Sequence, residues 1–394
     1  MSKLPRNALL KVVHHTHRGF TTFCKSSNND LTYRQYVAIR ILHVALKTGS
    51  GTQSSKVYSN RSTSCGPGTL SSRVYSNSST SSTQDITNDS VTEEKEHDLA
   101  LFPNPSDLNK FVPVCEPARD EDFKRLQEFV NHSKRLLILT GAGISTESGI
   151  PDYRSEGVGL YARSTNRPVQ YQDFVKDPEI RQRYWARNYV GWPKFGFFLP
   201  NKSHVALAEW EKKGKVHWLV TQNVDALHYK AGSKKITELH GSAHRVMCLS
   251  CDHKMTRPEM QVLIDSYNAN WSAQSDEIAP DADVQLSQEQ INGFKVPPCP
   301  SCGGPLKPEI TFFGDNVMKP IVEFIHEKVK ESDSLLFVGT SLQVYSGYRF
   351  ALAANDQGKP IAILNIGPTR ADKLARLQIH AKCGDILPKI RVWR

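Results

Sequence analysis

Short runs of apolar residues alternate with longer amphipathic segments from about residue 116 to the end of the chain. In the first run, Leu136 to Leu139, every side chain is apolar, a pattern typical of a strand buried on both faces of a parallel sheet. Similar runs cover residues 216–220, 236–239, 334–338 and 360–364. Because parallel strands are joined by helical crossovers, this alternation predicts an α/β fold with a Rossmann-like parallel sheet.

Helical periodicity fills the intervals between these runs. It predicts helices over residues 116–130, 177–189, 203–213, 319–331 and 347–356. Ser203 is a suitable N-cap for the third of them, and a further helix is expected to begin near Ser145, directly after the first strand.

Each apolar run ends in a cluster of small or polar residues. The clusters read TGAG, TQNVD, LHG, GTS and NIG, at residues 140–143, 221–225, 239–241, 339–341 and 365–367. In an open parallel sheet the carboxyl ends of the strands share one edge, and ligands bind in the crevice there. The sequence therefore predicts that these scattered clusters meet in one pocket.

The first cluster has the composition of a phosphate-binding turn, because small residues such as Gly141 and Gly143 let backbone N–H groups approach a phosphate. It differs from the dinucleotide fingerprint of dehydrogenases, which has a third small residue where Thr146 stands and an acidic residue about twenty positions later. The chain continues instead into the polar and aromatic segment 149–154. This pattern indicates a dinucleotide that is consumed as a substrate.

The first hundred residues differ in composition from the rest. Residues 1–29 contain Lys and Arg but no Asp or Glu, which is typical of a mitochondrial transit peptide; a disordered basic tail is the alternative. Residues 30–104 are rich in Ser and Thr and are expected to form a disordered linker. The folded catalytic domain is expected to cover residues 105–394.

The net charge of +10 comes partly from this basic leader. No dense stripe of Lys and Arg interleaved with aromatic residues is present, so direct nucleic-acid binding is not expected. No apolar stretch approaches the length needed to span a membrane.

The spacing of the cysteines predicts a metal site. Cys248 and Cys251 form one CxxC pair and Cys299 and Cys302 form another, which suits one tetrahedral, structural zinc ion. Unligated or redox-active thiols are the alternative. The zinc module is expected at about residues 243–312 as a small insertion with helical segments, and its polar stretch 276–290 is expected to project from the surface.

Taken in order, the motifs resemble one protein family. GAGIS (141–145), GIPDYR (149–154), TQNVD (221–225), LHG (239–241), FFGD (312–315), GTSL (339–342) and NIG (365–367), together with the two CxxC pairs, resemble the sirtuin family of NAD-dependent protein deacylases. The tyrosine of GIPDYR, the phrase GPTRAD (367–372) and the basic leader are most similar to its class II mitochondrial branch.

The resemblance implies where NAD binds. Pyrophosphate contacts are implied for Gly141, Ala142, Gly143, Arg154 and Ser341, the nicotinamide pocket for Ile150, Asp152, Tyr153, Asn223 and Asp225, ribose contacts for Gln222 and Asn223, and the adenosine half for Gly339, Thr340, Asn365, Ile366, Gly367 and Cys383.

The resemblance also implies a mechanism in which NAD is cleaved. The acyl oxygen of a modified lysine bonds to the ribose as nicotinamide leaves, and His240 then acts as general base on a ribose hydroxyl, with Asn223 assisting. The acyl-lysine peptide is expected to lie between residues 314–317 and 344–347. Without the other motifs, His240 would be read as structural, and Asn223 and Asp225 as caps of a helix at Ala226.

Departures from the wider family bear on the acyl group. Ser346 stands where many relatives have proline, and residues 155–170 lack the Tyr/Arg pair of desuccinylating relatives. These departures argue against robust deacetylation, and the resemblance to the class II mitochondrial branch implies removal of lipoyl-type, long or dicarboxylic acyl groups instead. The alternatives are a mono-ADP-ribosyltransferase that uses the same pocket and, more remotely, a non-catalytic zinc-ribbon binding module. The expected partners are acyl-lysine proteins, mainly metabolic enzymes of the mitochondrial matrix.

Overall fold

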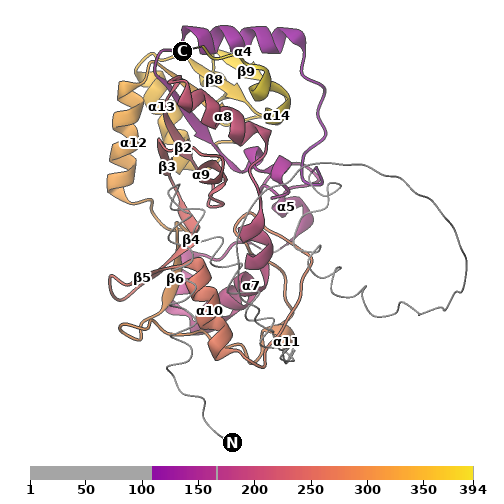
Figure 1. Cartoon of the computed structure of the whole chain (residues 1–394), viewed down its shortest axis with the longest axis vertical. Helices are drawn as coiled ribbons and strands as arrows, with labels where there is room; N and C mark the ends of the chain where they lie inside the picture. Colours follow the sequence, from indigo (N-terminus) through magenta and orange to yellow (C-terminus); the bar gives the residue numbers. More distant parts are fainter. Residues whose placement is uncertain (1–108, 166, 394) are drawn as a thin grey trace, which may run out of the picture. The chain divides into compact units, whose positions relative to one another are not determined.

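Six parallel strands form the larger sheet of the computed structural model, which describes residues 109–165 and 167–393 (Figure 1). The predicted leader 1–29 and linker 30–104 lie outside the described residues. The strands are arranged in the order β3-β2-β1-β7-β8-β9. Their bounds are β1 Leu136–Thr140, β2 Val216–Thr221, β3 Ile236–Glu238, β7 Ser334–Val338, β8 Ile361–Leu364 and β9 Leu377–Ile379. The predicted Rossmann-like sheet is confirmed, and β9 is a strand that the sequence patterns did not reveal.

The topological switch point of the sheet is at β1. From this central strand the chain builds β2 and β3 on one side, and later β7, β8 and β9 on the other. Thr140 at the end of β1 pairs with Thr221 of β2 and with Val338 of β7, so the three strands end level with one another. Such a switch point opens a crevice at the carboxyl ends of the strands.

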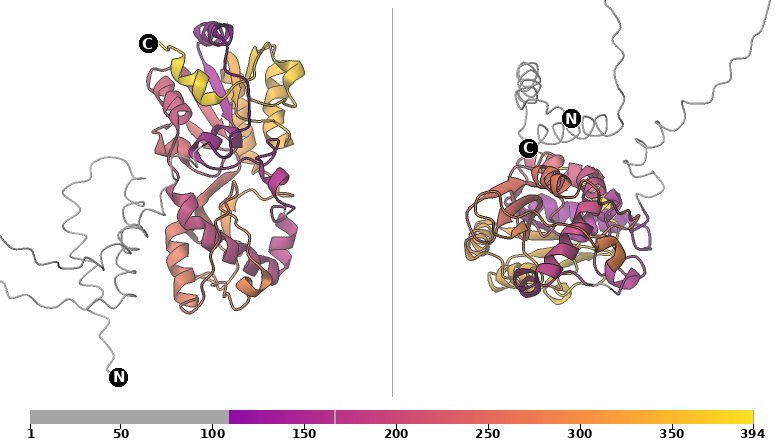
Figure 2. Two further views of the ribbon diagram at one scale, coloured as in Figure 1. Left: turned by 90° about the vertical axis from the view of Figure 1, so that its right-hand side faces the viewer. Right: turned by 90° about the horizontal axis from the view of Figure 1, so that it is seen from below.

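Helices cover both faces of this sheet (Figure 2). Leu136 and Ile138 pack in a core with α4 Asp120–His132, α8 Lys202–Lys212 and α14 Cys383–Ile386. Leu137 and Leu139 face the opposite way, toward α12 Lys319–Glu331 and α13 Tyr345–Asp356. Because successive strand residues point to opposite faces and both faces are buried, the strand must be apolar at every position.

A second, antiparallel sheet has the order β5-β4-β6. Its strands are β4 Gly241–Cys248, β5 Lys254–Thr256 and β6 Leu306–Ile310, and α10 Arg257–Tyr267 and α11 Gln288–Ile291 lie in the same module. Figure 1 shows α7 Pro178–Phe197 beside this module. The indole of Trp185 in α7 donates a hydrogen bond to the Leu306 carbonyl at 2.9 Å, which ties the helix to β6. The remaining helices are α5 Leu160–Arg163, α6 Tyr171–Lys176 and α9 Leu227–Lys230, with 3₁₀ turns at Asp372–Leu374 and Leu387–Lys389.

The helix expected near Ser145 is not formed. Two 3₁₀ turns, Ala142–Ile144 and Thr146–Ser148, follow β1 instead. The Gly143 N–H donates to the Gly339 carbonyl at 2.9 Å, and Gly149 has a left-handed φ of 88°. The loop is thus held against the end of β7 and turned away before an α-helix can develop, and no helix dipole points at the pocket from this position.

The predicted N-cap Ser203 is also wrong. Asn201 caps α8, because its side chain accepts hydrogen bonds from the N–H groups of Ser203 and His204. Asp177 caps α7, which runs past the predicted end at residue 189 to Phe197. The helices at 319–331 and 347–356 are confirmed, the second beginning at Tyr345.

The polar segment 276–290 does not project throughout. Ile278, Ala279, Ala282 and Val284 are buried. A Cβ atom on Gly191 of α7 would lie 2.9 Å from a Val284 methyl carbon, so the glycine lets the segment pack closely. Arg187 of α7 forms a 2.6 Å ion pair with Asp283 and fixes the segment further. The segment is therefore partly buried despite its polar composition, because its apolar residues pack inward and Gly191 in α7 leaves room for them.

Within residues 109–393, apart from residue 166, no helix is both long and apolar enough to cross a membrane.

Candidate active site

A cavity of about 1300 Å³ lies at the carboxyl ends of the central strands. Its lining includes every residue that the sequence assigned to NAD or to catalysis: Gly141, Ala142, Gly143, Ile150, Asp152, Tyr153, Arg154, Gln222, Asn223, Asp225, His240, Gly339, Thr340, Ser341, Asn365, Ile366, Gly367 and Cys383. The structure thus brings these scattered residues together, as expected from the shared sheet edge, while their individual roles remain predictions.

Glycines let the loops after β1 and β7 pack directly on each other. A Cβ atom on Gly141 would lie 2.6 Å from the Thr340 Cβ, and one on Gly143 would lie 2.8 Å from the Gly339 carbonyl oxygen. Around Gly367, in contrast, a Cβ atom would meet nothing within 4 Å. The two loops therefore form a tight floor, and the cavity stays open beside Gly367, which suits an extended dinucleotide.

A buried hydrogen-bond network joins the β1 loop to the β2 loop. Ser145 donates to the Asp225 carboxylate at 2.6 Å and accepts from the Asn223 amide at 3.0 Å. Asn223 also donates to the Gly141 carbonyl at 3.1 Å. The second Asp225 oxygen accepts from the Leu227 N–H at 2.9 Å, so this carboxylate also holds the start of α9. The helix-capping alternative is correct in part for Asp225, whereas Asn223 serves the network.

Gln222 links the same β2 loop to the β7 side. Its amide donates to the Thr340 hydroxyl at 2.8 Å. A Cβ atom on Gly347 would lie 2.7 Å from the Gln222 side-chain oxygen, so α13 approaches this wall only because residue 347 is glycine.

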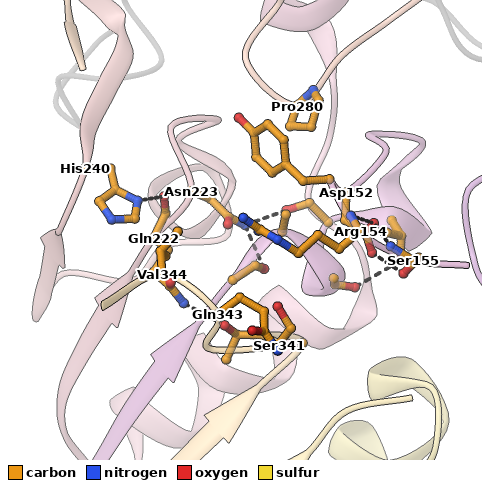
Figure 3. Close-up of a pocket in the computed structure, with 18 of the residues that line it drawn as sticks. Asp152, Arg154, Ser155, Gln222, Asn223, His240, Pro280, Ser341, Gln343 and Val344 are labelled. Carbon is orange, nitrogen blue, oxygen red and sulfur yellow. Dashed lines mark hydrogen bonds between the residues drawn. The ribbon is translucent and has the colours of Figure 1, made fainter. Parts of the chain in front are cut away.

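The loop 149–155 forms another wall. Asp152 accepts hydrogen bonds from the N–H groups of Arg154, at 3.0 Å, and Ser155, at 2.8 Å. The Ser155 hydroxyl also donates to it. Figure 3 shows the Arg154 side chain extending into the pocket from this turn. Tyr153 packs edge-on against Phe313, with ring centroids 5.8 Å apart, and burial raises the pKa of its hydroxyl well above the usual value. Asp152 therefore shapes the loop that carries the aromatic and cationic groups.

His240 is held at both ring nitrogens. Nδ1 lies 2.8 Å from the Gln222 carbonyl oxygen, and Figure 3 draws this hydrogen bond as a dashed line. Nε2 lies 2.8 Å from the Ser346 hydroxyl. A carbonyl only accepts, so Nδ1 carries the proton and the lone pair lies on Nε2. Burial lowers the pKa of His240 below its ordinary value of 6.5, and the Gln222 carbonyl opposes this. The ring is thus neutral near pH 7, as a general base must be.

Cys383, the first residue of α14, also lines the cavity. Burial raises the pKa of its thiol far above the usual value, so the sulfur is not a reactive thiolate. Asn365 donates to the Gly367 carbonyl at 2.7 Å and shapes the turn after β8.

The expected peptide clamp is wrong on one side. Tyr345, Ser346 and Gly347 form the first turn of α13 and cannot pair with a peptide strand. Val344 is extended, with φ −79° and ψ 133°. Only the residues up to Val344 can therefore add to a peptide strand here.

The four cysteines of the CxxC pairs converge as the spacing predicts. All four sulfur atoms lie within 4.8 Å of one another. The Cys248–Cys302 and Cys251–Cys299 sulfur distances are 3.5 and 3.8 Å. A zinc ion bonded to four thiolates at about 2.3 Å requires sulfur atoms about 3.8 Å apart, so the donor set fits tetrahedral zinc. Four thiolates complete the coordination shell, which assigns the ion a structural role.

Sequence reasoning missed several residues of the cavity. Ser145 lies within the GAGIS motif, but its role became visible only through its contacts with Asn223 and Asp225. Pro280 and Asp281 come from the segment that was expected to project, and they line the cavity (Figure 3 labels Pro280). Ser346 stood out in the sequence only as a departure from proline.

Comparison with known proteins yields one family. The model of the Sir2 family matches residues 141–346. A cattle protein named NAD-dependent protein lipoamidase sirtuin-4, mitochondrial, is 59% identical over 71% of this chain and 89% of its own length. The fruit-fly NAD-dependent protein deacylase Sirt4 is 53% identical over 72% of this chain and 91% of its own.

A solved structure of a Sir2 protein with a p53 peptide and NAD⁺ has a TM-score of 0.54 and 28% identity, covering 68% of this chain and 96% of that one. The resemblance within the family to sirtuin four, expected from the tyrosine of GIPDYR and from GPTRAD, agrees with the names of both relatives. With the cavity at the switch point, the four-cysteine site and these matches, the chain belongs to the Sir2 family, the sirtuins.

Proposed function

We propose that this protein is an NAD-dependent protein-lysine deacylase that transfers the acyl group of a modified lysine to ADP-ribose and releases nicotinamide. The observation that carries the proposal is the position of His240, whose neutral ring faces the same cavity as the Asn223–Ser145–Asp225 network. The names of the cattle and fruit-fly relatives support the same reaction class.

The residues of the cavity fit NAD as a co-substrate. Bound there, NAD supplies a ribose carbon that accepts the acyl oxygen as nicotinamide leaves. The glycine floor at Gly141 and Gly143 admits a pyrophosphate close to the backbone, and Arg154 offers a cation for it. Asn223 and Asp225 are fixed by buried hydrogen bonds and so present a preorganised wall to the nicotinamide side. His240 then takes up the proton of a ribose hydroxyl.

We propose a preference for lipoyl-type, long or dicarboxylic acyl groups over acetyl. The lipoamidase name of the cattle relative supports this preference. The lining of the cavity also extends beyond the residues assigned to NAD, to Tyr184, Phe312 and Pro280. Such a surface offers room for an acyl chain longer than acetyl.

We propose that the protein acts in the mitochondrial matrix on acylated metabolic enzymes. The cattle relative is named as mitochondrial, and residues 1–29 have the composition of a transit peptide. Protease protection in isolated mitochondria tests the compartment, since a matrix protein stays intact after rupture of the outer membrane alone.

The decisive experiment measures nicotinamide release by the zinc-loaded protein over lysine peptides with acetyl, long-chain, dicarboxylic and lipoyl modifications. We expect release to be fastest for the larger acyl groups, with radiolabelled ADP-ribose recovered as its acyl ester. Label retained on protein would point to the ADP-ribosyltransferase alternative. No release from any peptide would contradict the deacylase proposal.

A further inference from the structure

The hydroxyl of Ser346 occupies the position at His240 where a general base must receive its proton. Ser346 lies in the first turn of α13, 106 residues from the histidine in sequence, and its Oγ is 2.8 Å from Nε2. Both side chains line the cavity. The mechanism described above uses Nε2 and leaves this hydroxyl without a role.

The direction of this hydrogen bond follows from the other ring nitrogen. Nδ1 is 2.8 Å from the Gln222 carbonyl oxygen and must donate to it. Neutral imidazole carries only one N–H, so Nε2 accepts and the Ser346 hydroxyl donates. The lone pair that makes His240 a base is therefore already engaged by the serine proton.

The serine oxygen keeps accepting capacity. A hydroxyl has one proton and two lone pairs, and the Ser346 hydroxyl donates its proton in the hydrogen bond to His240. Within residues 109–165 and 167–393, no other side chain or backbone group hydrogen-bonds to this hydroxyl. A hydroxyl that enters the cavity can thus donate to the Ser346 oxygen, whereas direct access to Nε2 would require breaking the existing bond.

The inference rests on the proposed function and deepens it. We propose that Ser346 is a catalytic residue that relays the proton of the substrate ribose hydroxyl to His240. In the step, Ser346 Oγ takes the ribose proton while its own proton moves to Nε2. The serine ends neutral and His240 becomes imidazolium. The electron pair of the broken ribose O–H bond forms the bond to the acyl carbon, as the π bond between that carbon and the lysine nitrogen opens onto the nitrogen.

Burial and the Gln222 carbonyl, not a neighbouring charge among the described residues, shift the pKa of His240. The charged groups that line the cavity are Glu147, Asp152, Arg154, Glu156, Asp225, Asp281, Asp315, Arg349 and Lys382. Within the described part of the chain, none of them changes the pKa of His240, which burial and the Gln222 carbonyl set. The ability of the ring to accept the proton therefore depends on its local contacts, the Gln222 carbonyl at Nδ1 and the Ser346 hydroxyl at Nε2.

The test compares Ser346→Ala, Ser346→Thr and Gln357→Ala. Alanine removes the hydroxyl and favours the helix, and since Val344 is the N-cap and makes no side-chain cap, α13 loses no capping bond. Threonine keeps a hydroxyl. Gln357 is an exposed residue at the end of the same helix and serves as the control.

Two readouts are used. The first is the single-turnover rate of acyl transfer from a lipoyl-lysine peptide, with the dissociation constant for NAD measured in parallel. The second, which needs no substrate, is the ¹⁵N spectrum of histidine-labelled protein, in which the His240 signals are assigned by their loss in His240→Gln.

A relay predicts that Ser346→Ala slows acyl transfer on the order of 100-fold at unchanged NAD affinity, while threonine restores most of the rate. It also predicts that the His240 Nε2 signal shifts in Ser346→Ala and not in Gln357→Ala. An alanine variant with normal or faster acyl transfer would overturn the relay. An unshifted Nε2 signal in Ser346→Ala would also overturn the relay, and this readout needs no peptide substrate. Failure of every peptide to react would contradict the deacylase proposal and is therefore distinguishable from failure of the relay.

Discussion

The side-chain amide of Asn223 donates a hydrogen bond to the Ser145 hydroxyl, with 3.0 Å between nitrogen and oxygen. Ser145 in turn donates to Asp225 at 2.6 Å, so one small side chain connects Asn223 and Asp225 of the TQNVD segment. Ser145, Asn223 and Asp225 are 1%, 8% and 3% exposed. When a polar group buried to this extent loses its hydrogen-bond partner, the free energy of unfolding falls by more than the average net contribution of one hydrogen bond.

We expect Ser145→Ala to lower the free energy of unfolding by about 1–3 kcal/mol and to raise the apparent KM for NAD, because one oxygen of the Asp225 carboxylate loses its donor. Chemical denaturation and nicotinamide release measure the two effects. Ser148→Ala is the matched control: the Ser148 hydroxyl is buried without a partner in the described structure, so its loss should be nearly neutral. Equal effects of both substitutions would argue against the network.

His240→Tyr should abolish acyl transfer and leave the fold intact, since the remaining contacts of the cavity do not depend on the ring. For the wild-type protein, burial lowers the pKa of His240, so the base stays neutral to below pH 6.5. The acidic limb of the kcat/KM profile should therefore have its midpoint below pH 6.5. Wild-type turnover in the variant, or a midpoint above that value, would contradict the assignment of the base.

Buried histidines should make the fold sensitive to acid. Burial lowers the pKa of His204 and of His244 to about 3, and that of His228 well below 6.5. Below pH 6.5 these histidines bind protons in the unfolded chain but stay neutral in the folded protein, so the free energy of unfolding decreases as the pH falls.

The expected slope is about 1.4 kcal/mol per pH unit for each ring. Urea denaturation between pH 7.5 and 5 should show a shallower slope for His204→Gln than for the wild type. The exposed His132→Gln variant should keep the wild-type slope. If both variants retain it, His204 does not account for the acid sensitivity.

Cys299→Ser should remove zinc and lower the melting temperature by several degrees, because three thiolates cannot complete the tetrahedral shell. Metal analysis and thermal unfolding check this outcome. Cys115→Ser removes a thiol outside the cluster and should change neither property. An unaltered zinc content in the Cys299 variant would show that the metal site does not need all four cysteines.

Gly143→Ala should weaken NAD binding at least on the order of tenfold, because the added methyl group would lie 2.8 Å from the Gly339 carbonyl and push the two loops apart. Gly367→Ala is the spatial control, as its methyl group meets no protein atom within 4 Å and should leave the melting temperature unchanged. Calorimetric titration with NAD and thermal unfolding separate the effects. Wild-type NAD affinity in Gly143→Ala would show that the loop contact is not needed for binding.

The apolar runs predicted the larger sheet well because its strands are buried on both faces. Residues 334–338 are strand β7 as expected, and the helix at 319–331 also has the expected bounds. Strand β9, Leu377–Ile379, escaped prediction because, unlike the equally short β3, it is not followed by one of the small or polar clusters that marked the other strands. The zinc ligands could be assigned from spacing alone, since a CxxC pair brings its own two sulfur atoms together.

Local signals failed where a distant group competes for the same backbone or surface. The loop after β1 is bonded to the end of β7 through the Gly143 N–H and the Gly339 carbonyl, and Gly149 with its left-handed φ ends the second 3₁₀ turn, so no α-helix forms near Ser145. Gly191 in α7 makes room for the segment around Ala282, which its polar composition had placed at the surface. Gly339 and Gly191 are both far along the chain from the segments that they affect, so a prediction from neighbouring residues could not include them.

By itself, the sequence determined the fold class, the metal ligands and the set of residues at the sheet edge, because these depend on periodicity, on short spacings and on the shared direction of parallel strands. The tertiary structure decided which of those residues touch. Ser145 meets Asn223 across the loops after β1 and β2, and Ser346 meets His240 across 106 residues. Hydrogen bonds depend on tenths of an ångström, and only the packing of helices and strands around one core sets such distances.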